Sequence, residues 1–228
     1  MKDFPVFTTE TGVSSLILKE VPYRETAYIH IQDVQPDGFE EHLKECVSFC
    51  RMVGAEHIFA TGSELLQSYP VHCSLLEMRG TAWVDPDKLC NLFPVTEQTV
   101  ARWREIHNKA MQGVDNAKTL ETRDEKEIVG SGGAYFIHDN GELLGIGWME
   151  DTKLLVVASV VPGAGERIMH TLMSLVEGAD MIIEVASTNT RAIRLYEKMG
   201  FLIGTSLVKW HHIAEKTVEK QKIDDILK

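Results

Sequence analysis

Glu184 and Tyr196, a carboxylate and a phenol, stand twelve residues apart in the last third of the chain. Glu184 interrupts the apolar run 181–185, which is typical of a buried strand, and a carboxylate is costly to bury there unless it is paired, hydrated or functional. Tyr196 falls on the apolar face of the helix expected next. A carboxylate accepts a proton and a phenol donates one, so the pair predicts acid–base chemistry. The alternative is that Tyr196 is an ordinary core residue.

The segment between and after these two residues positions them. Residues 187–189 are Ser-Thr-Asn, three good N-cap residues for a following helix. Within that helix, spacings of three and four place one set of residues on a common inner face: Ala192, Leu195, Tyr196 and Met199. Gly200 is a natural C′ residue, so the helix is expected to end there and a strand to start at Phe201.

This segment also matches a known pattern, N-x-x-A-x-x-L-Y-E-x-x-G-F, at Asn189, Ala192, Leu195, Tyr196, Glu197, Gly200 and Phe201. It resembles the acyl-CoA-binding end of the GCN5-related N-acetyltransferase (GNAT) family, over roughly residues 154–212. The resemblance implies that Tyr196 protonates the departing thiolate of acetyl-CoA and that Asn189, with Ala192, lies beside the pantetheine and pyrophosphate. In some members a glutamate twelve residues before the tyrosine is the general base, and Glu184 holds that spacing.

The resemblance extends upstream. Residues 154–162 look like the family's fourth strand, which splays from its neighbour and offers backbone groups to the pantetheine amides. A backbone N–H of Val160 or Val161 is then expected to polarise the thioester carbonyl. Residues 168–176 look like the helix whose N-terminus receives the pyrophosphate, where free N–H groups and the helix dipole favour an anion.

The loop between that strand and helix departs from the family. The family's R/Q-x-x-G-x-G/A positions are held by Ala164, Arg167 and Met169, and the glycines are Gly163 and Gly165 instead. Either Gly163-Ala164-Gly165 forms a tighter phosphate cradle with Arg167 adding charge, or bulky side chains weaken or abolish nucleotide binding. We favour the cradle, because the strand and the tyrosine motif flank it in the right order.

The amino-acid composition and net charge limit the classes of molecule that this protein is expected to bind. The 228 residues are 44% hydrophobic and 25% charged, as in globular proteins, and the net charge of −11 argues against nucleic acid while suiting a cationic amine. With no membrane-length apolar run and no signal-peptide pattern, we expect no membrane association and a cytoplasmic location. The four cysteines form no C-x-x-C pair, so no metal site is expected.

An internal repeat and a hairpin set the expected architecture. Residues 49–59 echo 172–183, each being a helix end, a Gly-Ala stop, an acidic residue and a strand; coincidence is the alternative. Asn140-Gly141 predicts a tight turn between two strands, and a helix is expected over residues 96–111. The charged tail 216–228 suggests a surface helix. We therefore expect an α/β protein with a mixed central sheet and the GNAT acyltransferase fold in two halves.

The predicted halves are a degenerate, non-catalytic GNAT-like domain at 1–90 and a GNAT acetyltransferase domain at 91–228. The predicted function is acetyl transfer from acetyl-CoA to a primary amine, on a small molecule or a peptide, by direct attack. One alternative is a non-catalytic CoA-binding or regulatory protein, and another is transfer of longer acyl groups. The sequence leaves monomer and homodimer open.

Overall fold

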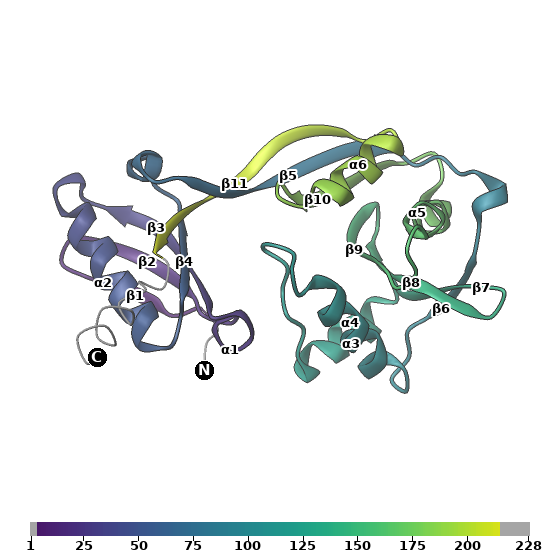
Figure 1. Cartoon of the computed structure of the whole chain (residues 1–228), viewed down its shortest axis with the longest axis horizontal. Coiled ribbons are helices and arrows are strands. Elements are labelled where there is room, and N and C mark those ends of the chain that lie inside the picture. Colours follow the sequence, from purple (N-terminus) through teal and green to yellow (C-terminus); the bar gives the residue numbers. More distant parts are fainter. Residues whose placement is uncertain (1–3, 215–228) are drawn as a thin grey trace, which may run out of the picture. The chain divides into compact units, whose positions relative to one another are not determined.

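The computed structural model describes residues 4–214, and these divide into two compact units. One unit holds the described residues up to His72 together with those from Lys209 on, and the other holds Cys73–Val208 (Figure 1). The predicted surface helix at 216–228 lies outside the described residues. No helix within residues 4–214 is both long enough and apolar enough to cross a bilayer.

The N-terminal unit is a twisted sheet with a long helix. Its strands lie in the order β1 (Val6–Thr8), β2 (Gly12–Ile17), β3 (Thr26–Val34), β4 (His57–Thr61) and the last part of β11 (Leu202–Ala214). Its helices are α1 (Val21–Arg24), α2 (Phe39–Met52) and the short 3-10 turns η1 (Pro36–Gly38) and η2 (Glu64–Ser68). The β3–β4 pair, joined through α2, is parallel, and the other strand pairs are antiparallel.

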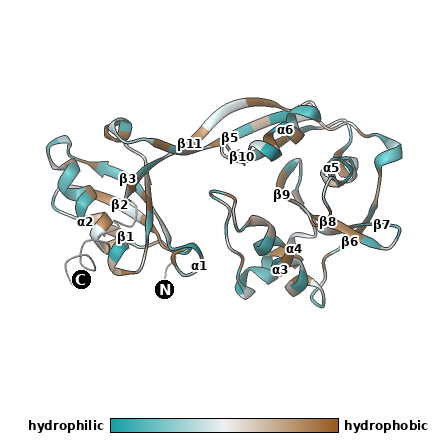
Figure 2. Cartoon of the chain, viewed as in Figure 1, coloured by the Kyte–Doolittle hydropathy of each residue, from teal (hydrophilic) through white to brown (hydrophobic). Residues whose placement is uncertain are grey.

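The core of this unit forms between α2 and the sheet. Hydrophilic and hydrophobic positions mix along α2, as expected for a helix with one apolar face (Figure 2). Leu43, Cys46 and Cys50 are buried on that face and belong to one cluster with Ile29 and Ile58 of the strands. The cysteines here therefore serve as small apolar core residues.

The C-terminal unit is a larger mixed sheet with helices on both faces. The strand order is β11 (its first part), β5 (Val71–Thr81), β10 (Asp180–Ala186), β9 (Lys153–Ser159), β8 (Glu142–Glu150), β7 (Ala134–Asp139) and β6 (Asn91–Pro94). Its helices are α3 (Val100–Met111), α4 (Glu125–Ser131), α5 (Gly165–Met173), α6 (Thr190–Lys198) and the 3-10 turns η3 (Pro86–Lys88), η4 (Thr122–Asp124) and η5 (Ser174–Val176).

Two apolar clusters hold these helices on the sheet. Ile168 and Leu172 of α5 are fully buried in the first cluster, and Trp103 of α3 is fully buried in the second, with Ile146 of β8. A Cβ added at Gly147 of β8 would lie 2.5 Å from a methyl carbon of Leu172, so glycine lets α5 sit close to the sheet.

Local sequence signals predicted the positions of these helices and strands to within a few residues. The predicted hairpin is β7–β8, with Asn140 and Gly141 at φ 47° and 83° as its turn requires. The predicted helix at 96–111 starts later, at Val100, because Thr96 and Thr99 form a hydrogen-bonded turn ahead of it. The helix expected from residue 168 instead starts earlier, at Gly165.

The predicted repeat corresponds to the same chain path in both units. In each, a helix joins two parallel neighbouring strands, β3–α2–β4 in one unit and β9–α5–β10 in the other. The glycine stop after each helical segment has a positive φ, 99° at Gly54 and 81° at Gly178. The chain therefore repeats one supersecondary unit.

The strand that follows each repeated β–α–β segment in space comes from the other end of the described chain, so the repeat does not extend to the neighbouring strand. The antiparallel neighbour of β4 is β11, from the end of the described chain, whereas that of β10 is β5, from the first half. This pairing explains why the boundary differs from the predicted division after residue 90. Residues 75–81 pair with β10, and the C-terminal unit accordingly begins at Cys73.

A buried polar network lies in the core of the N-terminal unit. The imidazole of His42 is fully buried, and its Nε2 lies 2.7 Å from the Ser14 hydroxyl while its Nδ1 lies 2.8 Å from the Thr9 hydroxyl. Burial lowers the pKa of His42, against a smaller opposing effect of the nearby Glu45 carboxylate. The folded state therefore favours the neutral ring.

We expect this histidine to make stability pH-dependent. Because its pKa is lower in the folded than in the unfolded chain, the unfolded state takes up a proton first, and the free energy of unfolding should fall as pH drops below about 6.5. Urea unfolding over a pH series measures this. His42→Gln should flatten the profile, and His57→Gln, at an exposed position, is the matched control. An unchanged profile in His42→Gln would contradict the assignment.

Candidate active site

The two central parallel strands of the C-terminal unit part after a short paired stretch. β9 and β10 pair at Lys153↔Ile182 and Leu154↔Ile183, and β9 then continues to Ser159 and β10 to Ala186 without further pairing. The edge of β9 beyond Leu154 is therefore open on the β10 side, and its backbone groups there are available to a ligand.

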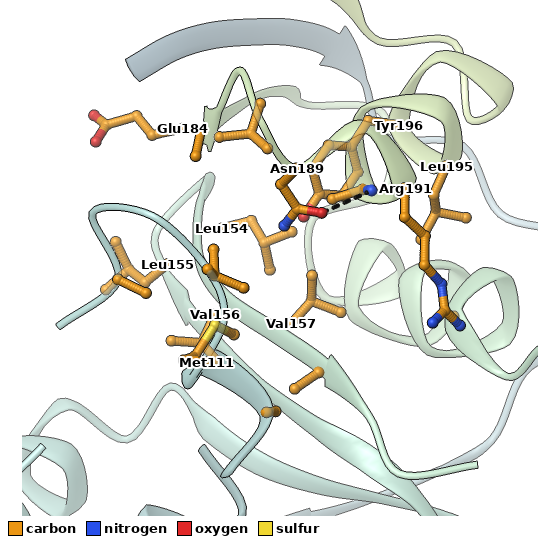
Figure 3. A pocket seen from close by; sticks show the side chains of 18 of the residues that line it. Met111, Leu154, Leu155, Val156, Val157, Glu184, Asn189, Arg191, Leu195 and Tyr196 are labelled. Atoms are coloured by element: carbon orange, nitrogen blue, oxygen red, sulfur yellow. Dashed lines mark hydrogen bonds between the residues drawn. The ribbon is translucent and has the colours of Figure 1, made fainter. Parts of the chain in front are cut away.

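A cavity of about 810 Å³ occupies this opening. One wall is β9, from Lys153 to Ser159, and the opposite wall comes from the end of β10 and the inner face of α6 (Figure 3). The volume lies within the range of small-molecule sites, about 300–1,000 Å³. Both predicted acid–base residues, Glu184 and Tyr196, line it.

Tyr196 lies on the inner wall of the cavity. Only 5% of Tyr196 is exposed, and its ring packs against that of Phe201 at a centroid distance of 6.4 Å. Burial raises the pKa of the Tyr196 phenol well above its usual range. The hydroxyl is thus protonated throughout the neutral range, as a proton donor must be.

Glu184 lies at the rim and is exposed, although the apolar run around it is typical of a buried strand. Its Oε1 accepts a hydrogen bond from the Lys153 ammonium of β9 at 2.5 Å, so the pair bridges the two strands where they part. Figure 3 shows its carboxylate directed away from Tyr196. The two predicted partners thus line one cavity without facing each other.

Asn189 and Ala192 also line the cavity, at the start of α6. The Asn189 side-chain oxygen accepts a hydrogen bond from the Ala192 backbone N–H at 3.2 Å, which makes Asn189 the N-cap of the helix. One member of the motif therefore has a structural role whether or not it contacts a ligand.

The expected oxyanion donors at Val160 and Val161 need correction. Both backbone N–H groups donate to the carbonyl of Leu144 on β8, at 2.8 and 3.4 Å, and neither residue lines the cavity. The bonds extend the contact between these chain segments beyond the last register pair of the β8–β9 ladder, Gly145↔Ser159. These two donors face β8 and are directed away from the open edge.

The glycine loop lies at one end of the cavity. Gly163 and Gly165 line it, and Gly163 has a φ of +83°, whereas Ala164 is buried in the core beneath. The N–H groups of residues 165–167 open α5 and have no carbonyl within the helix, since the first helical bond runs from Ile168 to Ala164. This end of the cavity thus carries the donors that favour an anion.

Arg167 does not add charge to this loop as expected. It lies outside the cavity lining, and its guanidinium donates to the Asp139 carboxylate at 2.7 Å, which holds the pKa of Asp139 below its usual range. Three charged side chains that the sequence did not single out line the loop end instead: Glu166, Arg191 and Lys198. The helical spacing of residues 190–198 places Arg191 and Lys198 off the apolar face, and no local sequence signal relates them to α5.

The other end of the cavity is formed by residues that no motif marked. Leu75 of β5, Met111 of α3 and the loop 114–118 line it. The loop is fastened to the start of α6 by a hydrogen bond from the Thr188 hydroxyl to Asp115 at 2.6 Å. This end is largely apolar with charged groups at its mouth.

A protein-family model covers the residues that form this cavity in part. The acetyltransferase (GNAT) family model matches residues 87–201, half of the chain, and includes the β9–α5 loop, Glu184 and Tyr196. This chain belongs to the GNAT acetyltransferase family. No curated protein matches its sequence.

Solved structures share the fold of this GNAT protein at low sequence identity. A GCN5-related N-acetyltransferase from Anabaena variabilis has 11% identity and a TM-score of 0.59, covering 92% of this chain and 62% of that one. One from Sphaerobacter thermophilus has 11% identity and a TM-score of 0.52, covering 89% and 76%. A tandem GNAT protein from the clavulanic acid biosynthesis pathway has 14% identity and a TM-score of 0.51, covering 92% and 82%. The predicted mixed α/β fold is confirmed.

The capping role of Asn189 gives a structural prediction. Asn189→Ala should lower the free energy of unfolding by about 1 kcal/mol, because the Ala192 N–H loses its acceptor. Asn189→Asp should keep most of the stability, because a carboxylate caps equally well. Urea unfolding of the two variants distinguishes them, and equal losses would show that the cap is not what the asparagine provides.

Proposed function

We propose that this GNAT protein transfers an acetyl group from acetyl-CoA to a primary amine by direct attack. The observation that carries the proposal is the parting of β9 from β10, with Tyr196 on the wall of the cavity so formed. An extended, amide-bearing pantetheine arm fits an open strand edge, where main-chain groups pair with it as another strand would.

The β8–β9 ladder supports a choice of backbone groups for this role. Val160 donates to β8, so the paired residues Ala158 and Val156 also direct their backbone groups to β8. Val157 and Ser159, which alternate with them, direct theirs to the open edge. We therefore assign the polarising N–H to Val157, in place of Val160 or Val161, so that it stabilises negative charge developing on the thioester oxygen.

The phosphates of CoA would lie at the loop end. Gly163 and Gly165 line that end, the first N–H groups of α5 point out of the helix, and Arg191 contributes a positive charge at the rim. This combination favours an anion even though the family's loop pattern is incomplete. Acetyl-CoA, when bound, supplies the activated acyl group, and the opposite, largely apolar end would receive the amine.

Proton transfer is assigned to the two predicted residues. Tyr196, kept protonated by burial, donates to the departing thiolate sulfur. Glu184, at the rim, removes a proton from the ammonium through a water, since its carboxylate is directed away from Tyr196. An amine of pKa near 10 is almost wholly protonated at neutral pH, so a base is required before it attacks.

Tyr196→Phe tests the proposal. We expect turnover of acetyl-CoA with an amine panel to fall roughly ten- to a thousandfold, because the general acid is lost, with CoA affinity by isothermal titration nearly unchanged. Unchanged turnover would remove Tyr196 from the chemistry. If CoA binds but wild type turns over no amine in the panel, the non-catalytic CoA-binding function would take the place of this one.

Glu184→Gln should lower the rate most at low pH, where less of the amine is neutral without a base. Lys153→Met is the matched control, because it breaks the same ion pair and leaves the carboxylate. A pH–rate profile of each variant separates the roles. If both variants lose the same activity at every pH, Glu184 acts only through its pair with Lys153.

A further inference from the structure

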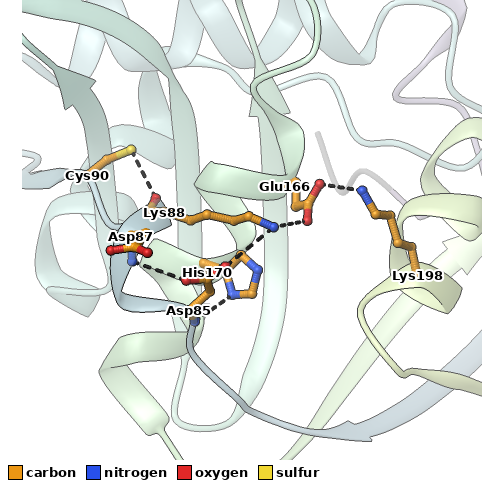
Figure 4. Close-up of polar contacts among 7 residues, drawn as sticks. All are labelled: Asp85, Asp87, Lys88, Cys90, Glu166, His170 and Lys198. Carbon is orange, nitrogen blue, oxygen red and sulfur yellow. Dashed lines mark hydrogen bonds and ion pairs between the residues drawn. The ribbon is translucent and has the colours of Figure 1, made fainter.

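One carboxylate joins three elements at the loop end of the cavity. Glu166, the second residue of α5, binds the ammonium of Lys198 from α6 at 2.5 Å and, through its other oxygen, that of Lys88 from η3 (Figure 4). The Lys88 ammonium also lies 3.6 Å from an Asp85 carboxylate oxygen. We call Asp85, Lys88, Glu166 and Lys198 the lysine–carboxylate cluster.

The cluster is electrically balanced, with two ammonium groups and two carboxylates. Both oxygens of Glu166 are engaged, and hydrogen bonds from Lys198 and then Lys88 lower the pKa of Glu166 to about 2. The carboxylate therefore stays ionised at any physiological pH. A lysine ammonium that pairs with a carboxylate can pair in the same way with a phosphate oxygen.

The cluster lies at the end of the cavity where a phosphate group would bind, so its charges affect phosphate binding. Glu166 and Lys198 line the cavity beside Gly163 and Gly165, where the first N–H groups of α5 are unpaired within the helix. An incoming phosphate group would meet the negative charge of Glu166, and Lys198 would already be neutralised by it, while Lys88 lies outside the cavity lining. Like charges a few ångströms apart in a partly enclosed site repel each other, so this carboxylate opposes phosphate binding.

We propose that Glu166 is an internal competitor for the phosphates of CoA: its carboxylate occupies Lys198 at the cavity wall, and tight binding of the cofactor requires this lysine to exchange it for phosphate. The inference rests on the proposed function, because it places CoA in this cavity. The opposite possibility is that Glu166 positions the lysines for phosphate, in which case its removal would weaken binding.

Isothermal titration of CoA and of pantetheine, which lacks the phosphates, separates these possibilities. Glu166→Gln should bind CoA about tenfold more tightly than wild type at low salt, with a smaller gain at high salt. Pantetheine affinity should not change. Glu177→Gln is the matched control, since it removes the same charge from an exposed position outside the cluster and outside the cavity lining. Its CoA affinity should stay within about twofold of wild type.

Equal or weaker CoA binding by Glu166→Gln, with pantetheine binding intact, would overturn this inference alone. If neither CoA nor pantetheine binds any variant, the proposed function fails and the inference with it. Lys198→Met is a second variant in case Glu166→Gln does not fold. It removes a cation and leaves the competing carboxylate, so CoA binding should weaken about tenfold at low salt, and unchanged binding would count against the exchange.

Discussion

The site depends on one interruption of backbone pairing. β9 and β10 share only two register pairs, and every other feature of the cavity follows from the point at which they separate. The separation leaves a buried sheet with open backbone groups, an arrangement that proteins seldom tolerate without a partner for them. The separation also leaves the inner face of α6, the helix after β10, directed at the opening. Tyr196 therefore lines the cavity from this helix, whose N-terminus is capped by Asn189.

The N-terminal unit shows what the same path looks like without that interruption. Its parallel strands β3 and β4 stay paired over five consecutive positions, from Thr26↔His57 to His30↔Thr61. A closed ladder has satisfied its backbone groups and offers no edge to an extended ligand. The two halves therefore share a supersecondary unit, while the open strand edge described for the C-terminal half has no equivalent between β3 and β4.

Local signals in the sequence predicted local structure well. The Asn-Gly turn, the positive-φ stop at Gly178 and the spacing around Tyr196 each act within a few residues, and the structure agrees with all three. Contacts between segments far apart in the chain had no comparable local signal in the sequence. The neighbours of β4 and β10, the bond of Arg167 to Asp139, and the cluster around Glu166 join residues far apart in the chain. The apolar run 181–185 likewise left open whether Glu184 is paired or hydrated, because its pairing with Lys153 joins two different strands.

The exchange of β5 and β11 has a consequence for synthesis on the ribosome. β4 is complete early, but its antiparallel neighbour is the last strand of the described chain, with Ala60 paired to His211. Until that strand emerges, the nascent N-terminal sheet has an unprotected edge beside the apolar cluster of α2, a surface prone to wrong pairing. The N-terminal unit is thus completed only by the last described strand, and its folding waits on translation of nearly all the described residues.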